Sequence, residues 1–345
     1  MRKFSIALPL FVAVGLTAQV SAQVTGPVPL AWRFTGTTTQ SPAGAPIIQG
    51  DNVYIAVGTR VYCLDIATGN RKWQAPAIDP IDGLFNSNML MLDDTIYASA
   101  SNKTLYAIDP SNGNIKWTYV APGAIIGAPI TAGKQVVLNI DGRSFMAVSA
   151  ETGKPSFQTP ERVFNGIRGN IFTVGTDVFY FTQRMELYST NVSTRKATLI
   201  TRFSLLPSNN APQVFGNNIY AVSGNNLVSI RPSGAPRFQK NLGKTLVFGP
   251  AVSAEGIAVV SDDGTMILLD TNGSPKTIPG SKGKEMRIDL GSRPITAPSV
   301  VGKLYAVATA NGAINLVDPA KGELVWSYTI RPVTAGLKVS SSSGS

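Results

Sequence analysis

The fold is decided by a repeated stretch whose clearest copy reads Leu105-Tyr-Ala-Ile-Asp-Pro-Ser-Asn-Gly-Asn-Ile-Lys-Trp117. An apolar start that suits a half-buried β-strand leads into an Asp…Gly turn, and an aromatic residue follows. Two further copies keep the pattern, namely Val61-Tyr-Cys-Leu-Asp-Ile-Ala-Thr-Gly-Asn-Arg-Lys-Trp73 and Ile314-Asn-Leu-Val-Asp-Pro-Ala-Lys-Gly-Glu-Leu-Val-Trp326. Self-similar segments spread along a chain indicate a repeat architecture.

Weaker copies set the period of this repeat. The segment 145–157 keeps the Thr-Gly pair but ends on Phe157, and only the apolar start remains at 187–191, 227–231 and 266–270. The aspartate position is filled in chain order by Asp65, Asp109, Ser149, Asn191, Arg231, Asp270 and Asp318. The steps between these positions run from 39 to 48 residues, which gives seven units of roughly 40 residues.

Each unit contains four short strand signals separated by turn residues. In the first unit the signals fall near 45–49, 53–57, 61–65 and 71–74, with Gly and Asn between them. Gly and Asn tolerate the positive φ of tight hairpin turns, and no segment shows sustained helical periodicity. We therefore predict an all-β fold, a β-propeller of about seven four-stranded antiparallel blades. Eight blades are the alternative, because Ala31-Trp32-Arg33-Phe34 resembles an extra outer strand ahead of the first unit.

The repeat resembles that of the pyrroloquinoline-quinone-like (PQQ-like) β-propeller family, which reads approximately L-Y-A-L-D-x-x-T-G-x-x-x-W. Gly50-Asp-Asn-Val-Tyr54 and Val301-Gly-Lys-Leu-Tyr305 are similar to the G-x-V-Y segment that precedes it in that family. In length and repeat, the chain resembles the barrel-assembly propeller lipoproteins of Gram-negative outer membranes (BamB-like proteins). It departs from them in lacking a lipid-anchor cysteine near the expected cleavage point.

This resemblance implies structural roles for the repeated residues. The outer-strand aromatic would pack between adjacent blades, with Phe157 and Phe238 as substitutes for Trp, and the Asp and Gly would shape the preceding turn. The residues expected in these roles are Asp65, Gly69, Trp73, Asp109, Gly113, Trp117, Gly153, Phe157, Asp270, Asp318, Gly322 and Trp326. Because these residue types recur in most units, we interpret them as blade construction and predict no catalytic residue among them.

The N-terminus has the pattern of a signal peptide. Arg2 and Lys3 precede an apolar stretch that is too short to span a bilayer, and Val20-Ser21-Ala22 offers the small residues of a cleavage site. We predict a signal peptide at 1–22, a single PQQ-like propeller domain at 23–335 and a flexible Ser-rich tail at 336–345. No later apolar run is long enough for a transmembrane segment. The expected location is outside the cytoplasm, periplasmic or secreted, and soluble after cleavage.

Composition excludes several kinds of chemistry. The chain has no histidine and one cysteine, Cys63, so Ser-His-Asp and Cys-His catalysis, histidine-ligated metals and an internal disulfide are excluded. We interpret Cys63 as a small, buried strand residue, because Ala107 and Ala147 stand at its position in other units. The 30 basic and 20 acidic residues are scattered, which argues against nucleic acid and allows a weak attraction to anionic surfaces.

The family resemblance implies a quinone cofactor, but the residues of this chain do not support one. The alcohol dehydrogenases of this family are much longer and carry a vicinal Cys-Cys pair, which this chain lacks. Calcium needs about six to eight converging oxygen ligands. The closest acidic pairs, Asp93-Asp94 and Asp262-Asp263, fall where turns are predicted. We therefore expect neither PQQ nor calcium, and the missing ligands favour a protein that is not an enzyme.

The predicted function is an exported, non-catalytic scaffold that binds a protein or peptide partner in the cell envelope. A PQQ- and calcium-dependent oxidoreductase and a cell-wall or polysaccharide-binding module are the alternatives. Partner binding on propellers tends to use exposed loops. The two loops with unusual composition are the apolar segment 75–88 and the basic segment 275–285. The candidate residues in them are Ile81, Leu84, Phe85, Lys276, Lys282 and Lys284.

Overall fold

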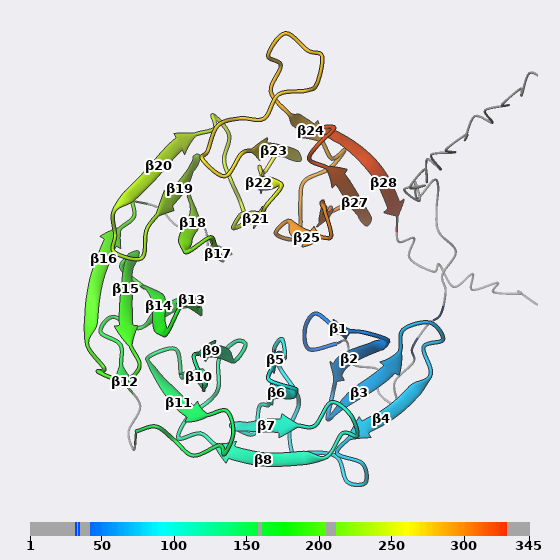
Figure 1. Cartoon of the computed structure of the whole chain (residues 1–345), viewed down its shortest axis with the longest axis vertical. Helices are drawn as coiled ribbons and strands as arrows, with labels where there is room; N and C mark the ends of the chain where they lie inside the picture. The colour runs from blue at the N-terminus through cyan, green and yellow to red at the C-terminus, as the bar shows by residue number, and fades with distance from the viewer. Residues whose placement is uncertain (1–31, 33, 35–41, 158–160, 205–211, 330–345) are drawn as a thin grey trace, which may run out of the picture.

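Seven four-stranded antiparallel sheets follow one another around a ring (Figure 1). The computed structural model describes residues 32, 34, 42–157, 161–204 and 212–329, and no helix occurs among them. The predicted all-β propeller with seven blades is therefore confirmed. The predicted signal peptide at 1–22 and the tail at 336–345 lie outside the described residues.

Every blade has the same up-and-down strand order, with the first strand near the ring centre and the fourth strand on the outer rim (Figure 1). Blades 1 to 4 are β1 (Ile47–Gln49), β2 (Asn52–Val57), β3 (Arg60–Asp65), β4 (Arg71–Ala75); β5 (Leu90–Leu92), β6 (Thr95–Ser99), β7 (Thr104–Ile108), β8 (Ile115–Val120); β9 (Ile130–Ala132), β10 (Gln135–Ile140), β11 (Ser144–Ser149), β12 (Glu161–Arg162); and β13 (Ile167–Val174), β14 (Asp177–Thr182), β15 (Glu186–Asn191), β16 (Ala197–Arg202). Blades 5 to 7 are β17 (Gln213–Phe215), β18 (Asn218–Ser223), β19 (Asn226–Ile230), β20 (Pro236–Asn241); β21 (Ala251–Ser253), β22 (Gly256–Val260), β23 (Thr265–Leu269), β24 (Arg287–Asp289); and β25 (Ser299–Val301), β26 (Leu304–Ala308), β27 (Ala313–Asp318), β28 (Glu323–Thr329).

The core lies between consecutive blades rather than inside any one of them. In blade 2 every residue of the two middle strands, β6 and β7, is buried, because a neighbouring blade covers each face. Alternate residues therefore point to different neighbours. Ile96 packs with Tyr54 of blade 1, whereas Tyr97 packs with Leu138 of blade 3. We call the side of a blade that meets the next blade in chain order its forward face, and the opposite side its back face.

Candidate functional site

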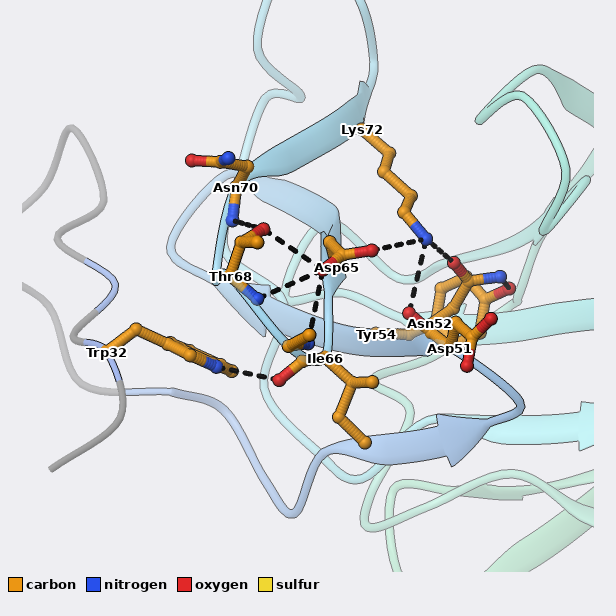
Figure 2. Close-up of polar contacts among 10 residues, drawn as sticks. Trp32, Asp51, Asn52, Tyr54, Asp65, Ile66, Thr68, Asn70 and Lys72 are labelled. Carbon is orange, nitrogen blue, oxygen red and sulfur yellow. Dashed lines mark hydrogen bonds and ion pairs between the residues drawn. The ribbon is translucent and has the colours of Figure 1, made fainter. Parts of the chain in front are cut away.

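The Asp…Gly turn of the repeat is held by hydrogen bonds around one carboxylate, as Figure 2 shows for blade 1. Asp65 Oδ1 accepts hydrogen bonds from the backbone N–H of Thr68 at 3.0 Å and from its hydroxyl at 3.0 Å. Asp65 Oδ2 lies 3.1 Å from Lys72 Nζ, which also donates to Asn52 Oδ1 at 2.7 Å. The hydrogen bond from Lys72, and then those from Thr68, lower the pKa of Asp65 below its ordinary value. This aspartate therefore orders the turn before the outer strand.

The other aspartates of the repeat have the same kind of partners. Each of them accepts backbone N–H groups of its own turn: Asp109 from Ser111, Asp270 from Asn272 and Ser274, and Asp318 from Ala320. In blade 4 Asn191 takes the position, and its Oδ1 accepts from Ser193 and Thr194 at 3.1 Å each. An amide oxygen can thus accept the same kind of backbone hydrogen bonds within the turn as the carboxylate.

Replacing Asp65 by asparagine should therefore change stability less than replacing it by alanine, because asparagine keeps the acceptor. The pKa of the Asp65 carboxyl is lowered in the folded state, so its ionised form stabilises the fold above the unfolded pKa, and this contribution is lost as pH falls through the folded pKa. Thermal unfolding between pH 7 and pH 3 measures this. The midpoint difference between wild type and Asp65→Asn should shrink as pH falls, and a constant difference would contradict the assignment.

In blades 2, 3, 6 and 7 the glycine of the turn is the seat for a large side chain from the preceding blade. Gly113 has a φ of +79°, and a Cβ there would lie 2.7 Å from Trp73 Cε3. Trp73 Nε1 donates to Pro110 O at 2.9 Å, next to Asp109 in the same turn. The pair Trp117 and Gly153 repeats this arrangement, with Trp117 Nε1 donating to Ala150 O at 3.2 Å. The indole therefore links the outer strand of one blade to the turn of the next.

Where the repeat is degenerate, other side chains take the same seat. Phe238 packs on Gly273, and Met286 packs on Gly322. In blade 4 the glycine is replaced by Arg195, whose guanidinium carbon lies 4.9 Å from the ring centre of Phe157 in a cation–π contact. Sequence reasoning missed Met286 and Arg195, because neither matches the repeat. The spacing from the aspartate position is the one signal that would have found Arg195.

Cys63 lies on the forward face of blade 1, is 1% exposed and pairs across the sheet with Tyr54 and Trp73. Burial raises the pKa of the Cys63 thiol. We expect a thiol reagent at pH 8 to label the folded protein at least ~100-fold more slowly than the urea-unfolded protein, since labelling requires opening of the blade interface. Fast stoichiometric labelling of the folded protein would show that this interface is open.

The two loops predicted to bind a partner differ in how exposed their predicted binding residues are. Ile81 and Phe85 are buried between blades 1 and 2, whereas Leu84 is 39% exposed. The basic loop projects outward from the rim between β23 and β24 (Figure 1). There Lys276 Nζ donates to Glu255 O at 2.7 Å, and Lys282 and Lys284 are exposed. Of the six predicted residues, Leu84, Lys282 and Lys284 keep the accessibility that binding requires.

One face of blade 7, which we call its open face, is less buried than the faces of blade 2. In its two middle strands buried and half-buried residues alternate strictly, whereas both faces are buried in the middle strands of blade 2. Leu268 of blade 6 and Leu316 of blade 7 each lie two residues before the aspartate of their repeat. Leu268 is 0% exposed, whereas Leu316 is half-buried. The open face comprises Val301, Leu304, Ala306, Ala308, Ile314, Leu316, Trp326 and Tyr328, which register places on one side of the sheet.

The tyrosine of blade 7 stands one residue earlier in its strand than those of blades 1 and 2, although the strand pairing is unchanged. Tyr54 and Tyr97 pair with Cys63 and Ala107, but Tyr305 pairs with Val317, one residue further toward the aspartate. Because successive side chains of a strand point to opposite faces, Tyr305 lies on the back face of its sheet. The Tyr305 hydroxyl therefore reaches back to blade 6 and donates to Gly256 O at 2.7 Å, while Leu304 and Ala306 join the open face.

The back face of blade 1 is covered by two aromatic side chains rather than by a described sheet. Trp32 packs on Gly69 and donates from Nε1 to Ile66 O at 2.8 Å (Figure 2). The Phe34 ring centre lies 5.1 Å from that of Tyr62, and both aromatics cover the back face of blade 1. Apolar clusters join each blade to the next from blade 1 to blade 7, but within the described ranges no cluster joins blade 7 to blade 1. We call the junction between the open face of blade 7 and the back face of blade 1 the seam.

The described residues do not fit a quinone with a bound cation. Within the described part of the chain, no group of three or more His, Cys, Asp or Glu comes close enough to hold a metal ion. The acidic pairs considered above lie in turns, and Asp263 pairs there with Lys244. The same part of the chain contains no helix long and apolar enough to cross a membrane. The expectation that PQQ and calcium do not bind remains a prediction.

Comparison with known proteins identifies a family whose sequence profile matches most of the chain. The sequence profile of the family described as outer membrane protein assembly factor BamB matches residues 85–198 and 197–340. Serine/threonine-protein kinase AfsK of Streptomyces griseus is 31% identical over 155 residues, which cover 42% of this chain and 19% of the kinase. The chain's match thus spans about a fifth of that relative.

The solved structures that it resembles share its fold at low identity. BamB from Moraxella catarrhalis is 16% identical with a TM-score of 0.62, covering 84% of this chain and 88% of that one. A europium-containing methanol dehydrogenase is 13% identical with a TM-score of 0.63, covering 87% and 80%. At these identities the likeness concerns the propeller architecture.

Proposed function

Because the chain belongs to the family of outer membrane protein assembly factor BamB, we propose that it is an exported, non-catalytic propeller that binds a protein or peptide partner in the cell envelope. The family description is that of a factor that assists the assembly of other proteins. A scaffold of this kind needs a surface, and does not need a catalytic constellation. The open face of blade 7 is the surface that supports the proposal.

The composition and exposure of this face suit a protein partner. Val301 is 50% exposed, and Tyr328 is 39% exposed and stacks on Trp326 with 5.9 Å between ring centres. Contiguous exposed apolar side chains on a soluble protein mark interaction sites, and aromatic residues are enriched in the centres of protein interfaces. The face is a sheet surface, which suits the extended contact of a polypeptide better than the enclosure of a small molecule.

Export is supported by the charged start, apolar stretch and small-residue site within residues 2–22. Expression of the full sequence in a Gram-negative host, followed by fractionation and N-terminal sequencing, tests it. The expected result is a periplasmic product that begins at Gln23. A cytoplasmic product that retains residues 1–22 would remove export from the proposal and leave partner binding open.

Partner binding is tested by placing a photo-crosslinking amino acid at position 316 of the full chain in its native envelope. Val120, 69% exposed on the outer strand of blade 2, is the matched control for an exposed apolar position away from the seam. We expect a discrete protein adduct from position 316 and none from position 120. Adducts of equal yield at both positions, or no adduct at 316, would contradict the proposed function.

A further inference from the structure

We propose that a cleft between blades 3 and 4, which are neighbours in the ring (Figure 1), binds the phosphate group of an organic phosphate ester. The guanidinium groups of Arg143 and Arg162 are its counter-ions. Arg143 lies in the turn between β10 and β11, and Arg162 lies in the outer strand β12. The inference is independent of the proposed function, because it concerns another surface and a small anion rather than a polypeptide.

The cleft has a volume of about 560 Å³ and is formed by elements of both blades. Blade 3 contributes the β10–β11 turn and β12, and blade 4 contributes the start of β13 and the turn between β14 and β15. Ile167 N–H donates to Gly142 O at 2.7 Å, and Gln183 Nε2 donates to Ile167 O at 3.0 Å. Hydrogen bonds within and between the two blades therefore hold the walls of the cleft in place.

The first support is an arginine that lacks the counter-ion of its equivalent in the next blade. In blade 4, Arg202 of the outer strand pairs across the sheet with Glu186, and the two side chains form an ion pair at 3.0 Å. Blade 3 has Arg162 and Ser144 at the same two positions. Ser144 carries no charge, and its hydroxyl donates to Ile140 O at 3.3 Å. An anion from outside the chain can take the place that the glutamate fills in blade 4.

The acidic side chains nearby are engaged elsewhere. Glu161 pairs with Arg195 at 2.6 Å. Asp141 lines the cleft, but its Oδ1 accepts the backbone N–H of Ala124 at 2.8 Å and its Oδ2 packs on Gly123. The ion pairs among the described residues include neither of the two arginines of the cleft. Both guanidinium groups are therefore left without a carboxylate partner.

The turn that carries Arg143 does not require an arginine. The same turn position is Gly264 in blade 6 and Gly312 in blade 7. In all three turns the N–H of this residue donates to the carbonyl oxygen three residues earlier, at 3.0 or 3.1 Å. The guanidinium group thus adds nothing to the turn that glycine does not supply, and its position at the cleft calls for another role.

Charge and geometry specify the anion. A phosphate ester carries a charge of about −1.5 to −2 at pH 7, so it can neutralise two guanidinium groups where a carboxylate neutralises one. The planar fork of a guanidinium group also matches phosphate oxygens in a bidentate contact. Gly142 and Asn165, both in the cleft lining, have φ values of +64° and +66°. Their N–H groups have no hydrogen-bond partner among the described residues, so they are further donors for an anion.

Phe164 specifies what is attached to the phosphate. It stands between two residues of the cleft lining, and its side chain is 90% exposed, more than any other large hydrophobic side chain of the described residues. An aromatic ring offers a large apolar surface, which a ligand can cover favourably. The cleft is larger than a phosphate group requires. We therefore expect a phosphate that is joined to a ring, as in an aryl or sugar phosphate.

The probes are phenyl phosphate and inorganic phosphate, titrated into the full chain by calorimetry at low ionic strength. We expect one site per chain with a dissociation constant below ~1 mM for phenyl phosphate. Arg143→Gln and Arg162→Gln should each weaken its binding at least tenfold. Arg293→Gln removes an exposed arginine outside the cleft that has no ion pair among the described residues. It is the matched control and should leave binding unchanged, and thermal unfolding of each variant checks that the fold is kept.

Two further measurements separate the anion from the ring. Phe164→Ala should weaken the binding of phenyl phosphate at least threefold and leave that of inorganic phosphate unchanged. Lowering the pH from 7.5 to 5 should weaken both probes, because the second pKa of a phosphate lies at about 6 and the ligand loses one charge.

Four results would overturn the inference. Phenyl phosphate fails to bind at about 10 mM. Arg293→Gln weakens binding as much as the two cleft variants do, which makes the attraction one of general charge. Inorganic phosphate binds as tightly as phenyl phosphate, which removes the ester. Vesicles of phosphatidylglycerol bind while phenyl phosphate does not, which makes a membrane surface the ligand. None of these results changes the expected crosslink from position 316, so a failure here is distinguishable from a failure of the proposed function.

Discussion

Replacing Gly113 by alanine is expected to lower the free energy of unfolding by about 3 kcal/mol, from strain at positive φ and from overpacking against Trp73. The backbone at Gly113 has a φ of +79°, and the new Cβ would lie 2.7 Å from the indole. The ring of Trp73 cannot withdraw from the new Cβ without losing the hydrogen bond from its Nε1 to Pro110 O, next to Asp109. The β-bulge between β3 and β4 also restricts the outer strand that carries the ring. Urea unfolding followed by tryptophan fluorescence measures the change.

Gly142→Ala is the matched control for this substitution. Gly142 has a φ of +64°, but a Cβ there would meet nothing within 4 Å, so the expected loss is the backbone strain alone, about 1 kcal/mol. The double variant Gly113→Ala, Trp73→Ala should lose less than the two single variants summed, because the clash disappears with the ring. Equal losses at Gly113 and Gly142 would show that the indole does not occupy the glycine seat.

The second large effect is a contrast between two leucines at the same position of neighbouring blades. Leu268→Ala in blade 6 should cost about 3 kcal/mol, because the side chain is 0% exposed within the cluster between blades 6 and 7. Leu316→Ala in blade 7 should cost about 1 kcal/mol, since its side chain is already half-buried on the open face. Residue type, strand position and distance from the aspartate are matched. Equal costs would mean that the seam is closed in the free protein.

Sequence reasoning reached the architecture because blade construction is local. The turn at Asp65 and the glycine at Gly69 lie within a few residues of each other, so each copy carries its own signal. The role of Trp73 was expected from the family resemblance, and the structure places it on Gly113. The extra strand signal around Trp32 was also visible, and it left seven and eight blades open. The described residues contain seven sheets.

The candidate site could not be predicted in the same way, because it depends on contacts between distant segments. Tyr305 belongs to a segment like that of Tyr54, and the observed pairing with Val317 shows that its side chain points to the opposite face of the sheet. Leu316 has the residue type of a core position, and its exposure follows from which blade stands beside it. Ile81 and Phe85 were chosen for their apolar character, which equally suits the buried place that they occupy between blades.

The central claim, that an apolar face stands open at the seam to receive a partner, is tested most directly by thiol labelling. In a Cys63→Ala background, which copies Ala107 and Ala147 at the same position, single variants Leu316→Cys and Leu268→Cys are treated with a thiol reagent under native conditions. We predict that position 316 reacts within about tenfold of the unfolded rate and that position 268 is protected at least ~100-fold, because it requires opening of the core. Equal protection at both positions would contradict the open seam and, with it, the proposed binding surface.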